Sequence, residues 1–126
     1  MLFFDTYAII EIVRGNPAYR AYENEPMRTS LLNLGELHYN LLKELNPYLA
    51  DEWFERLKPF IVEFDAEIMR NAMIFKFAHR KRKLSTPDCV GYGLAKRLGA
   101  KFLTGDRQFQ DLPNVEFVPK EQNKTI

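Results

Sequence analysis

The sequence contains very few residues of the kinds that build disulfides and clustered metal sites: one cysteine, Cys89, and two histidines among 126 residues. A single cysteine excludes an intramolecular disulfide and any metal site built from several thiolates. No charged-then-apolar leader and no run of about 18 apolar residues occurs, so a membrane segment is not expected. Glycine-rich phosphate loops of the GxGxxG or P-loop type are absent as well. These absences favour a protein of the reduced cytoplasm.

The sequence does contain enough apolar residues for a core. Hydrophobic residues make up 46% of the chain and aromatic residues 13%, which suits a single domain, residues 1–126, without a structural metal. The net charge is only +1, yet nine of the 18 basic residues and two of the 17 acidic residues lie between Lys76 and Arg107. This concentration of positive charge indicates an anionic partner.

Strand-like and helix-like patterns alternate along the chain. Short apolar runs predict strands over residues 1–4, 27–32, 60–64, 101–104 and 115–118. Apolar residues at helical spacing predict helices over residues 7–13, 17–24, 34–45, 47–57, 66–79 and 87–98. Residues 119–126 form a polar tail that we expect to fray. The alternation predicts a three-layer α/β/α fold with a mainly parallel sheet of four or five strands.

Capping residues suggest where two of these helices begin. Thr86 is the expected N-cap of the helix that contains Asp88, and Gly99 is placed to end it in the left-handed conformation. Asn33 is the expected N-cap of an earlier helix, which puts Glu36 in that helix's first turn. Both carboxylates therefore belong near helix starts.

Four acidic residues share this kind of position, just after a predicted strand or in the first turn of a helix: Asp5, Glu36, Asp88 and Asp106. In a parallel sheet the strand ends and the following helix starts meet at one edge, so the four carboxylates should converge. Each one alone could be a cap, a partner of the helix dipole or a turn residue. Crowded together they repel and need protons or a cation, and oxygen ligands favour Mg²⁺ or Mn²⁺. Water activated by such an ion can attack a phosphodiester.

Other candidate residues have structural explanations that we prefer. His38 and His79 lack a partner at metal-ligand spacing and are expected to be ordinary helix-surface residues. Cys89 is expected to be a small buried hydrophobe. Gly91 and Gly93 lie inside a predicted helix, where each costs roughly 1 kcal/mol relative to alanine, which suggests close packing against the sheet or a neighbouring chain.

The order and spacing of these motifs resemble a PIN domain, and the chain length resembles the VapC toxin branch of that family. The matching segments are Phe3-Phe4-Asp5-Thr6, Leu34-Gly35-Glu36-Leu37, the helix of Asp88, and Leu103-Thr104-Gly105-Asp106-Arg107-Gln108-Phe109. The resemblance implies a Mg²⁺- or Mn²⁺-dependent endoribonuclease that cuts single-stranded or loop RNA. It also implies a homodimer and inhibition by a small antitoxin protein.

The four acidic residues match the catalytic and metal-binding positions of that family. Gln108 stands where many relatives carry a further acid, so the resemblance does not decide whether the site holds one metal ion or two. Asn33 stands where threonine or serine is common, which we interpret as a change of helix cap.

Two sets of residues are expected to support the site. Thr6 and Thr104 lie one or two residues from proposed ligands and could hydrogen-bond a carboxylate or a water on the ion, although both could equally be plain strand-end threonines. The expected RNA contacts are Arg80, Lys81, Arg82, Lys83 and Arg107. Residues 80–83 could equally be solvated side chains at a helix end, where their positive charge complements the helix dipole without contacting RNA.

Three other functions compete with a toxin ribonuclease. A phosphatase of the haloacid dehalogenase type needs a second aspartate where Tyr7 stands, and a response-regulator receiver needs adjacent acids near the N-terminus. A non-cleaving PIN-like module that binds RNA or protein is the strongest alternative. Retention of all four acids argues against that module.

Overall fold

The computed structural model describes residues 1–120, so the predicted fraying of residues 121–126 lies outside the described residues. The helices are α1 (Thr6–Val13), α2 (Leu31–Glu44), α3 (Pro47–Leu57), α4 (Ala66–Ala78) and α5 (Thr86–Leu98). The strands are β1 (Leu2–Phe4), β2 (Lys101–Thr104) and β3 (Val115–Phe117). Short 3₁₀ helices are η1 (Pro17–Tyr22), η2 (Lys58–Phe60) and η3 (Arg107–Phe109). Within the described residues, no helix combines the length and apolarity needed to cross a bilayer.

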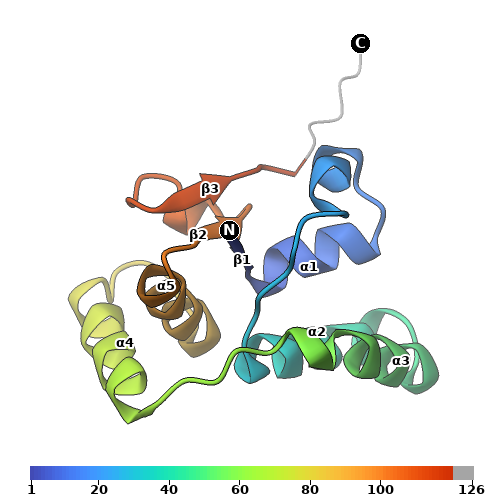
Figure 1. Ribbon diagram of the computed structural model, residues 1–126, viewed down its shortest axis with the longest axis horizontal. Coiled ribbons are helices and arrows are strands. Elements are labelled where there is room, and N and C mark those ends of the chain that lie inside the picture. The colour runs from blue at the N-terminus through green and yellow to red at the C-terminus, as the bar shows by residue number, and fades with distance from the viewer. Residues whose placement is uncertain (121–126) are drawn as a thin grey trace.

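The three strands form one parallel sheet in the order β1-β2-β3 (Figure 1). Phe3 pairs with Phe102, and Phe102 pairs with Val115, so the register is continuous across the sheet. Parallel neighbours need long crossover connections, and helices supply the crossover between β1 and β2. The predicted α/β architecture with a parallel sheet is therefore confirmed.

The predicted strands over residues 27–32 and 60–64 reduce to one isolated parallel bridge, between Thr29 and Ile61. Thr29 lies beside β1, where its hydroxyl donates to the carbonyl of Phe4 at 2.9 Å. Its backbone also pairs with Phe60 and Val62. The next residue, Ser30, caps α2, so the chain leaves the sheet after a single bridge. The described part of the sheet therefore has three regular strands where the sequence predicted four or five.

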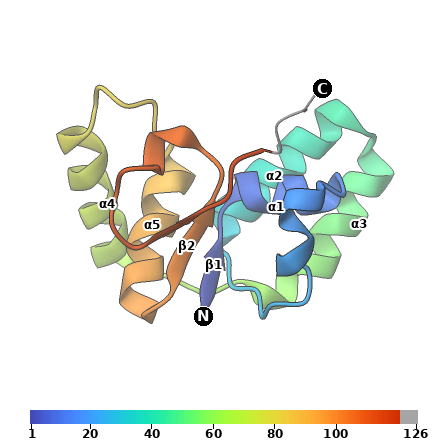
Figure 2. The same ribbon diagram turned by 90° about the horizontal axis from the view of Figure 1, so that it is seen from above.

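The side chains of the sheet alternate between two separate hydrophobic cores. Phe3 and Phe102 point to a core that they share with α4 and α5. Phe4 and Leu103, the next residues in each strand, point to a second core that contains residues of α1, α2 and α3. Figure 2 shows α4 and α5 on one side of the strands and α1, α2 and α3 on the other. Both faces of the sheet are buried, as expected for parallel strands.

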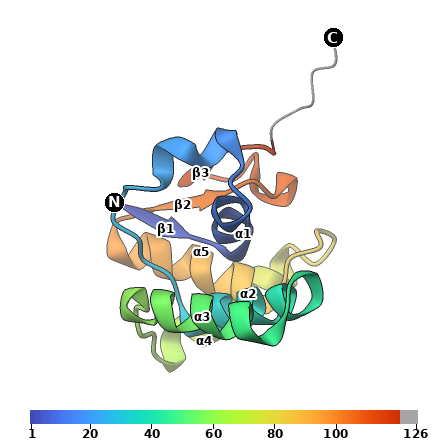
Figure 3. The same ribbon diagram turned by 90° about the vertical axis from the view of Figure 1, so that its right-hand side faces the viewer.

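Close packing between helix α5 and the sheet explains one of the two glycines in that helix. A methyl group on Gly91 would lie 2.8 Å from a ring carbon of Phe3 and 3.2 Å from one of Phe102. A methyl group on Gly93 would meet nothing within 4 Å. Figure 3 shows the strands side by side with α5 running along them. Close packing against the sheet is confirmed for Gly91 and wrong for Gly93, and packing of Gly93 against a neighbouring chain stays a prediction.

Candidate metal centre

Asp5 lies where β1 ends and α1 begins, and it is 1% exposed. Its Oδ1 accepts a hydrogen bond from the Ala8 backbone N–H at 2.8 Å and so caps the helix. Its Oδ2 is buried and has no hydrogen-bond partner among residues 1–120. Burial raises the pKa of Asp5 well above its usual value, and the Thr104 side chain only partly offsets that rise. Asp5 is thus a buried acid with one unpaired oxygen.

Asp88 lies in the first turn of α5, held by a reciprocal pair of hydrogen bonds with Ser85. Asp88 Oδ2 accepts from the Ser85 N–H at 3.0 Å, and Ser85 Oγ accepts from the Asp88 N–H at 3.1 Å. Ser85 is therefore the N-cap, and the prediction of Thr86 was one residue too late. The reason is that Ser85 and Asp88 have the i, i+3 spacing of a capping box, which Thr86 lacks. Gly99 ends the helix in the left-handed conformation as predicted, with φ of 70°.

Asp106 follows β2 after the single residue Gly105. Its backbone N–H donates to Thr104 Oγ1 at 3.0 Å, and its Oδ1 accepts from the Gln108 N–H at 2.9 Å, which caps η3. A methyl group on Gly105 would collide with Tyr7, Tyr19 and the backbone of Val118. Glycine at this position leaves the space that these three residues occupy beside the loop of Asp106.

Glu36 lies farther into α2 than predicted. The N-cap of α2 is Ser30, whose side chain accepts from the Asn33 N–H at 3.2 Å, so the prediction of Asn33 as the cap was wrong. Ser30 has the extended backbone of an N-cap, whereas the Asn33 side chain bonds Ser30 and Thr6 and caps no helix. Glu36 therefore lies in the second turn, with a half-buried side chain.

The four carboxylates are electrostatic neighbours. Beyond burial, which has the largest effect, Asp88 and Asp106 both raise the pKa of Asp5. Burial, together with Glu36 and Asp106, raises the pKa of Asp88 to about 6. In the arrangement described for residues 1–120, no three acidic, histidine or cysteine side chains are close enough to hold one ion together. The site is therefore an open cluster of acids around Asp5 and Asp88.

The chemistry of this cluster suits a hard divalent ion. All four candidate donors are carboxylate oxygens, the ligands that Mg²⁺ and Mn²⁺ prefer. The buried Oδ2 of Asp5 lacks the partner that buried polar atoms normally have, and a cation would supply it. The type of donor atom therefore matches the predicted metal, and the binding of the ion stays a prediction.

A buried polar network beside the acids was not predicted from the sequence. Ser30 Oγ donates to Asn33 Oδ1 at 2.6 Å, and Asn33 Nδ2 donates to Thr6 Oγ1 at 3.2 Å. All three residues are at most 4% exposed. The Thr6 hydroxyl therefore contacts Asn33 and no carboxylate, whereas Thr104 lies against both Asp5 and Asp106.

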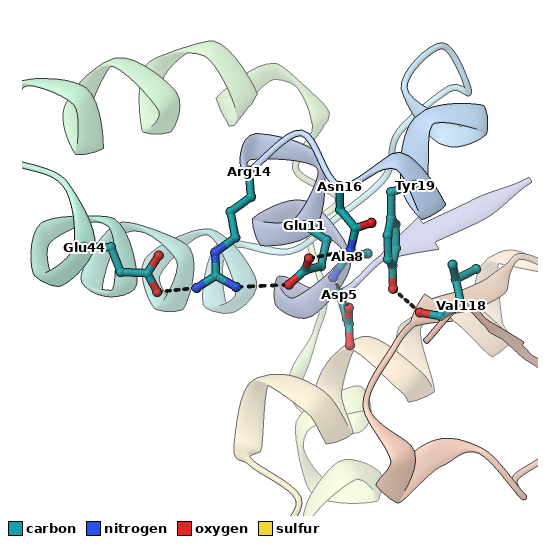
Figure 4. A network of polar contacts seen from close by, with 8 residues as sticks. All are labelled: Asp5, Ala8, Glu11, Arg14, Asn16, Tyr19, Glu44 and Val118. Carbon is teal, nitrogen blue, oxygen red and sulfur yellow. Dashed lines mark hydrogen bonds and ion pairs between the residues drawn. The ribbon is translucent and has the colours of Figure 1, made fainter. Parts of the chain in front are cut away.

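A second network ties the far end of α1 to α2, as Figure 4 shows. Glu11, 4% exposed, accepts from Arg14 at 3.1 Å and from Asn16 at 2.7 Å. Arg14 also donates to Glu44 at the end of α2, at 2.7 Å. Hydrogen bonds therefore connect α1 to α2 near their starts, through Thr6 and Asn33, and near their ends, through Arg14 and Glu44. These contacts fix the position of Asp5 relative to Glu36.

The basic run after α4 is divided between structural and exposed residues. Arg82 makes a two-pronged ion pair with Asp111 at 2.8 and 3.0 Å and donates to the Gln108 carbonyl at 2.6 Å. Arg80 stacks on Phe77 with its guanidinium carbon 4.4 Å from the ring centre. The remaining cations, Lys81, Lys83 and Arg107, are exposed. Arg82 therefore connects the basic run to the loop that follows Asp106.

The histidines and the cysteine lie in ordinary structural positions. His38 Nε2 is 2.7 Å from Asp51 on α3, and His79 Nδ1 is 3.0 Å from the carbonyl of Phe75 on its own helix. Cys89 is buried in the core beneath α5.

Solved structures with the same fold include several bacterial toxins. VapC20 of Mycobacterium tuberculosis, described as a Sarcin-Ricin loop cleaving toxin, matches with a TM-score of 0.79 and 21% identity over 94% of this chain and 100% of that chain. A toxin-antitoxin complex from Klebsiella pneumoniae matches with a TM-score of 0.72 and 18% identity over 92% and 96%. VapBC-1 from nontypeable Haemophilus influenzae matches with a TM-score of 0.67 and 20% identity over 94% and 98%.

The sequence comparison agrees with the shared fold. No curated protein sequence matches the chain. Residues 2–115, which include all four acids and all three strands except the last two residues of β3, match the PIN domain family. The chain therefore belongs to the PIN domain family.

Proposed function

We propose that this protein is a Mg²⁺- or Mn²⁺-dependent endoribonuclease, the toxin of a toxin–antitoxin pair acting in the cytoplasm. The observation that carries the proposal is the buried Oδ2 of Asp5, which has no hydrogen-bond partner among the described residues and lies beside the carboxylates of Asp88 and Asp106. A purely structural cluster would not keep a buried acid with an unsatisfied oxygen, because that arrangement costs stability. The structural relative VapC20 is described as a Sarcin-Ricin loop cleaving toxin, which supports RNA as the substrate.

In this proposal Asp5, Glu36, Asp88 and Asp106 hold the divalent ion and are the catalytic residues. When bound, the ion would supply an activated water for attack on the phosphodiester. Asp88, with a pKa of about 6, exchanges its proton near neutral pH and so can change charge when a cation or substrate arrives. Gln108 offers no further carboxylate, so one ion is the simpler arrangement.

Thr104 and Thr6 support these acids in different ways. Thr104 Oγ1 accepts from the Asp106 N–H, and its side chain also lies against Asp5. The Thr6 hydroxyl bonds the side chain of Asn33 and does not bond a carboxylate directly. Loss of such a supporting contact typically costs about 10- to 100-fold in metal affinity or activity. Thr104→Val should therefore cost more cleavage than Thr6→Val.

RNA, an antitoxin protein and a second copy of the chain are the partners in this proposal. The exposed Lys81, Lys83 and Arg107 are available for phosphates, whereas Arg82 is already paired. Exposed apolar residues on α2 and α3 offer surface for a protein partner: Tyr39, Leu42, Leu45 and Tyr48. The structural relatives include toxin-antitoxin complexes, which supports an antitoxin.

The proposal is tested by comparing Asp106→Asn with Asp111→Asn. Both variants remove one negative charge close to η3, but Asp111 is paired with Arg82 and is not one of the four acids. We expect Asp106→Asn to abolish RNA cleavage and to weaken Mn²⁺ binding at least about 10-fold in calorimetry. Asp111→Asn should keep both within about two-fold of the wild type.

Cleavage that persists in Asp106→Asn or in excess chelator would contradict a metal-dependent nuclease at this site. Metal binding and RNA binding without any cleavage would instead support the alternative, a non-cleaving PIN-like module.

A further inference from the structure

An exposed aromatic ring lies at the end of α4, next to the basic run. Phe77 is 67% exposed, although large apolar side chains are usually covered. Arg80 lies over the ring at 4.4 Å from its centre, and its guanidinium also donates to the Phe77 carbonyl at 3.0 Å. The hydrogen bond holds the guanidinium in place, so Phe77 and Arg80 present a fixed pair of flat groups to solvent.

Phe77 and Arg80 line a groove of about 330 Å³ together with Met73, Lys76 and Arg82. Two of the five lining side chains are apolar and three are cationic, and none is acidic. The partner that matches this lining has a flat apolar group next to a negative charge. A nucleotide of single-stranded RNA has this combination, since its base stacks and its phosphate is anionic.

Two hydrogen bonds connect the groove to the segments that carry the candidate acids. Lys76 Nζ donates at 2.5 Å to the carbonyl of Leu84, the residue before the N-cap Ser85 that binds Asp88. Arg82 donates to the carbonyl of Gln108, whose own N–H is bonded to Asp106. These two hydrogen bonds therefore hold the groove residues Lys76 and Arg82 against the segment before α5 and the loop after β2.

We propose that this groove is a stacking site for one base of single-stranded RNA. The inference rests on the proposed ribonuclease function and adds a position for the substrate. Phe77 and Arg80 stack on the base, while Lys76 faces the neighbouring phosphate. Arg82 keeps the groove in place and makes no phosphate contact, because Asp111 already neutralises it.

The test measures binding of two short probes by fluorescence anisotropy. One probe is a labelled oligouridine, and the other is an abasic oligonucleotide of the same length that keeps only sugar and phosphate. The cleavage-deficient Asp106→Asn protein is the background. Phe77→Ala is compared with Ile74→Ala, a control on the same helix that is 60% exposed but does not line the groove. Phe77→Trp restores a larger stacking surface.

Phe77→Ala should weaken oligouridine binding by roughly 5- to 150-fold, the usual range for losing one stacked base, and leave abasic binding unchanged. Ile74→Ala should stay within about two-fold of the background on both probes, and Phe77→Trp should bind at least as tightly as the background. Equal losses on both probes, equal losses in Phe77→Ala and Ile74→Ala, or no loss at all would overturn the stacking site. Absence of oligouridine binding by the background protein would overturn it too.

A cleavage assay on long RNA separates this inference from the proposed function. Wild-type protein that cleaves while Phe77→Ala cleaves equally well would reject the groove and keep the nuclease. Wild-type protein that does not cleave would reject the nuclease, whatever the oligonucleotide binding shows.

Discussion

Asn33 and Thr6 exchange two hydrogen bonds in the protein interior. Asn33 Nδ2 donates to Thr6 Oγ1 at 3.2 Å, and Thr6 Oγ1 donates to the backbone carbonyl of Asn33 at 3.3 Å. Thr6 is the first residue of α1 and directly follows Asp5, and Asn33 lies one turn before Glu36. The pair therefore sets the distance between the two helices that carry these acids.

Asn33→Ala should lower the free energy of unfolding by about 1–3 kcal/mol, because it removes the buried side-chain hydrogen bonds to Thr6 and Ser30 and leaves each hydroxyl only its bond to the backbone of residue 33. Asn40→Ala is the matched control: its side chain makes one hydrogen bond, to the Glu36 carbonyl, and is only half-buried. Urea denaturation of both variants measures the difference. Equal losses in the two variants would show that the buried network adds no stability of its own.

The two glycines of α5 should respond to alanine in opposite directions. Gly93→Ala should raise the free energy of unfolding by about 0.5–1 kcal/mol, since the added methyl meets nothing and alanine favours a helix. Gly91→Ala should lower it by about 1–3 kcal/mol, because the methyl would press on Phe3 and Phe102. Thermal or urea unfolding of the two single variants decides. Stabilisation by both changes would mean that α5 can move away from the sheet at little cost.

Protonation of Asp88 should make the metal-free protein more stable in mild acid. The pKa of Asp88 is about 6 in the folded protein against 3.8 for an ordinary aspartate, so the folded state binds the proton more tightly. This stabilisation is complete below pH 3.8 and is lost as the pH rises through about 6. Asp88→Asn should reduce that slope, with Asp5 left to contribute in the same direction, and, after allowance for partial exposure, add about 1–2 kcal/mol at pH 7.

The measurement is urea unfolding from pH 4 to 8 in the presence of chelator. Glu55→Gln, which changes an exposed carboxyl on α3, should keep the wild-type slope. A slope as steep in Asp88→Asn as in the wild type would show that Asp88 does not contribute to it.

The ion pair between Arg82 and Asp111 makes a separate prediction about pH. Its two hydrogen bonds lower the pKa of Asp111 to about 2, so the pair is intact above pH 3.8 and is lost as the pH falls through about 2. Arg82→Lys cannot form both bonds and should return the Asp111 pKa towards 3.8. NMR titration of the side-chain carboxyl follows the change. Arg80→Lys should leave Asp111 unaffected, and an Asp111 titration that is the same in Arg82→Lys would disprove the pairing.

Sequence periodicity predicted the regular elements well and the extended pieces poorly. Residues 2–4, 101–104 and 115–117 are strands as expected. Residues 27–32 and 60–64 looked alike in the sequence, but their apolar side chains pack without forming a regular strand. Leu32, at the start of α2, packs with Val62 and Phe64 against one core, and Met27 and Ile61 pack against the other. An apolar run reports burial, and burial does not require a paired strand.

The candidate site was predicted in part for a similar reason. Asp5 and Asp106 follow strand ends, which the sequence marks clearly, and so their neighbourhood could be anticipated. Asn33 could not, since a polar residue near a helix start has the same local signature whether it caps the helix or crosses to another one. Only the arrangement of α1 against α2 shows which applies.

The division of the interior into two cores has a consequence for the four acids. Asp5 and Glu36 belong to helices packed in one core, Asp88 starts the helix packed in the other, and Asp106 leaves the sheet between them. An ion held by all four would add a link between two layers that otherwise meet through the sheet and through the contact of α2 with α5. Amide hydrogen exchange in α5 would then slow together with exchange in α1 when the ion binds. Most residues of α5 would be protected without contacting the ion, because only Asp88 in the first turn binds it.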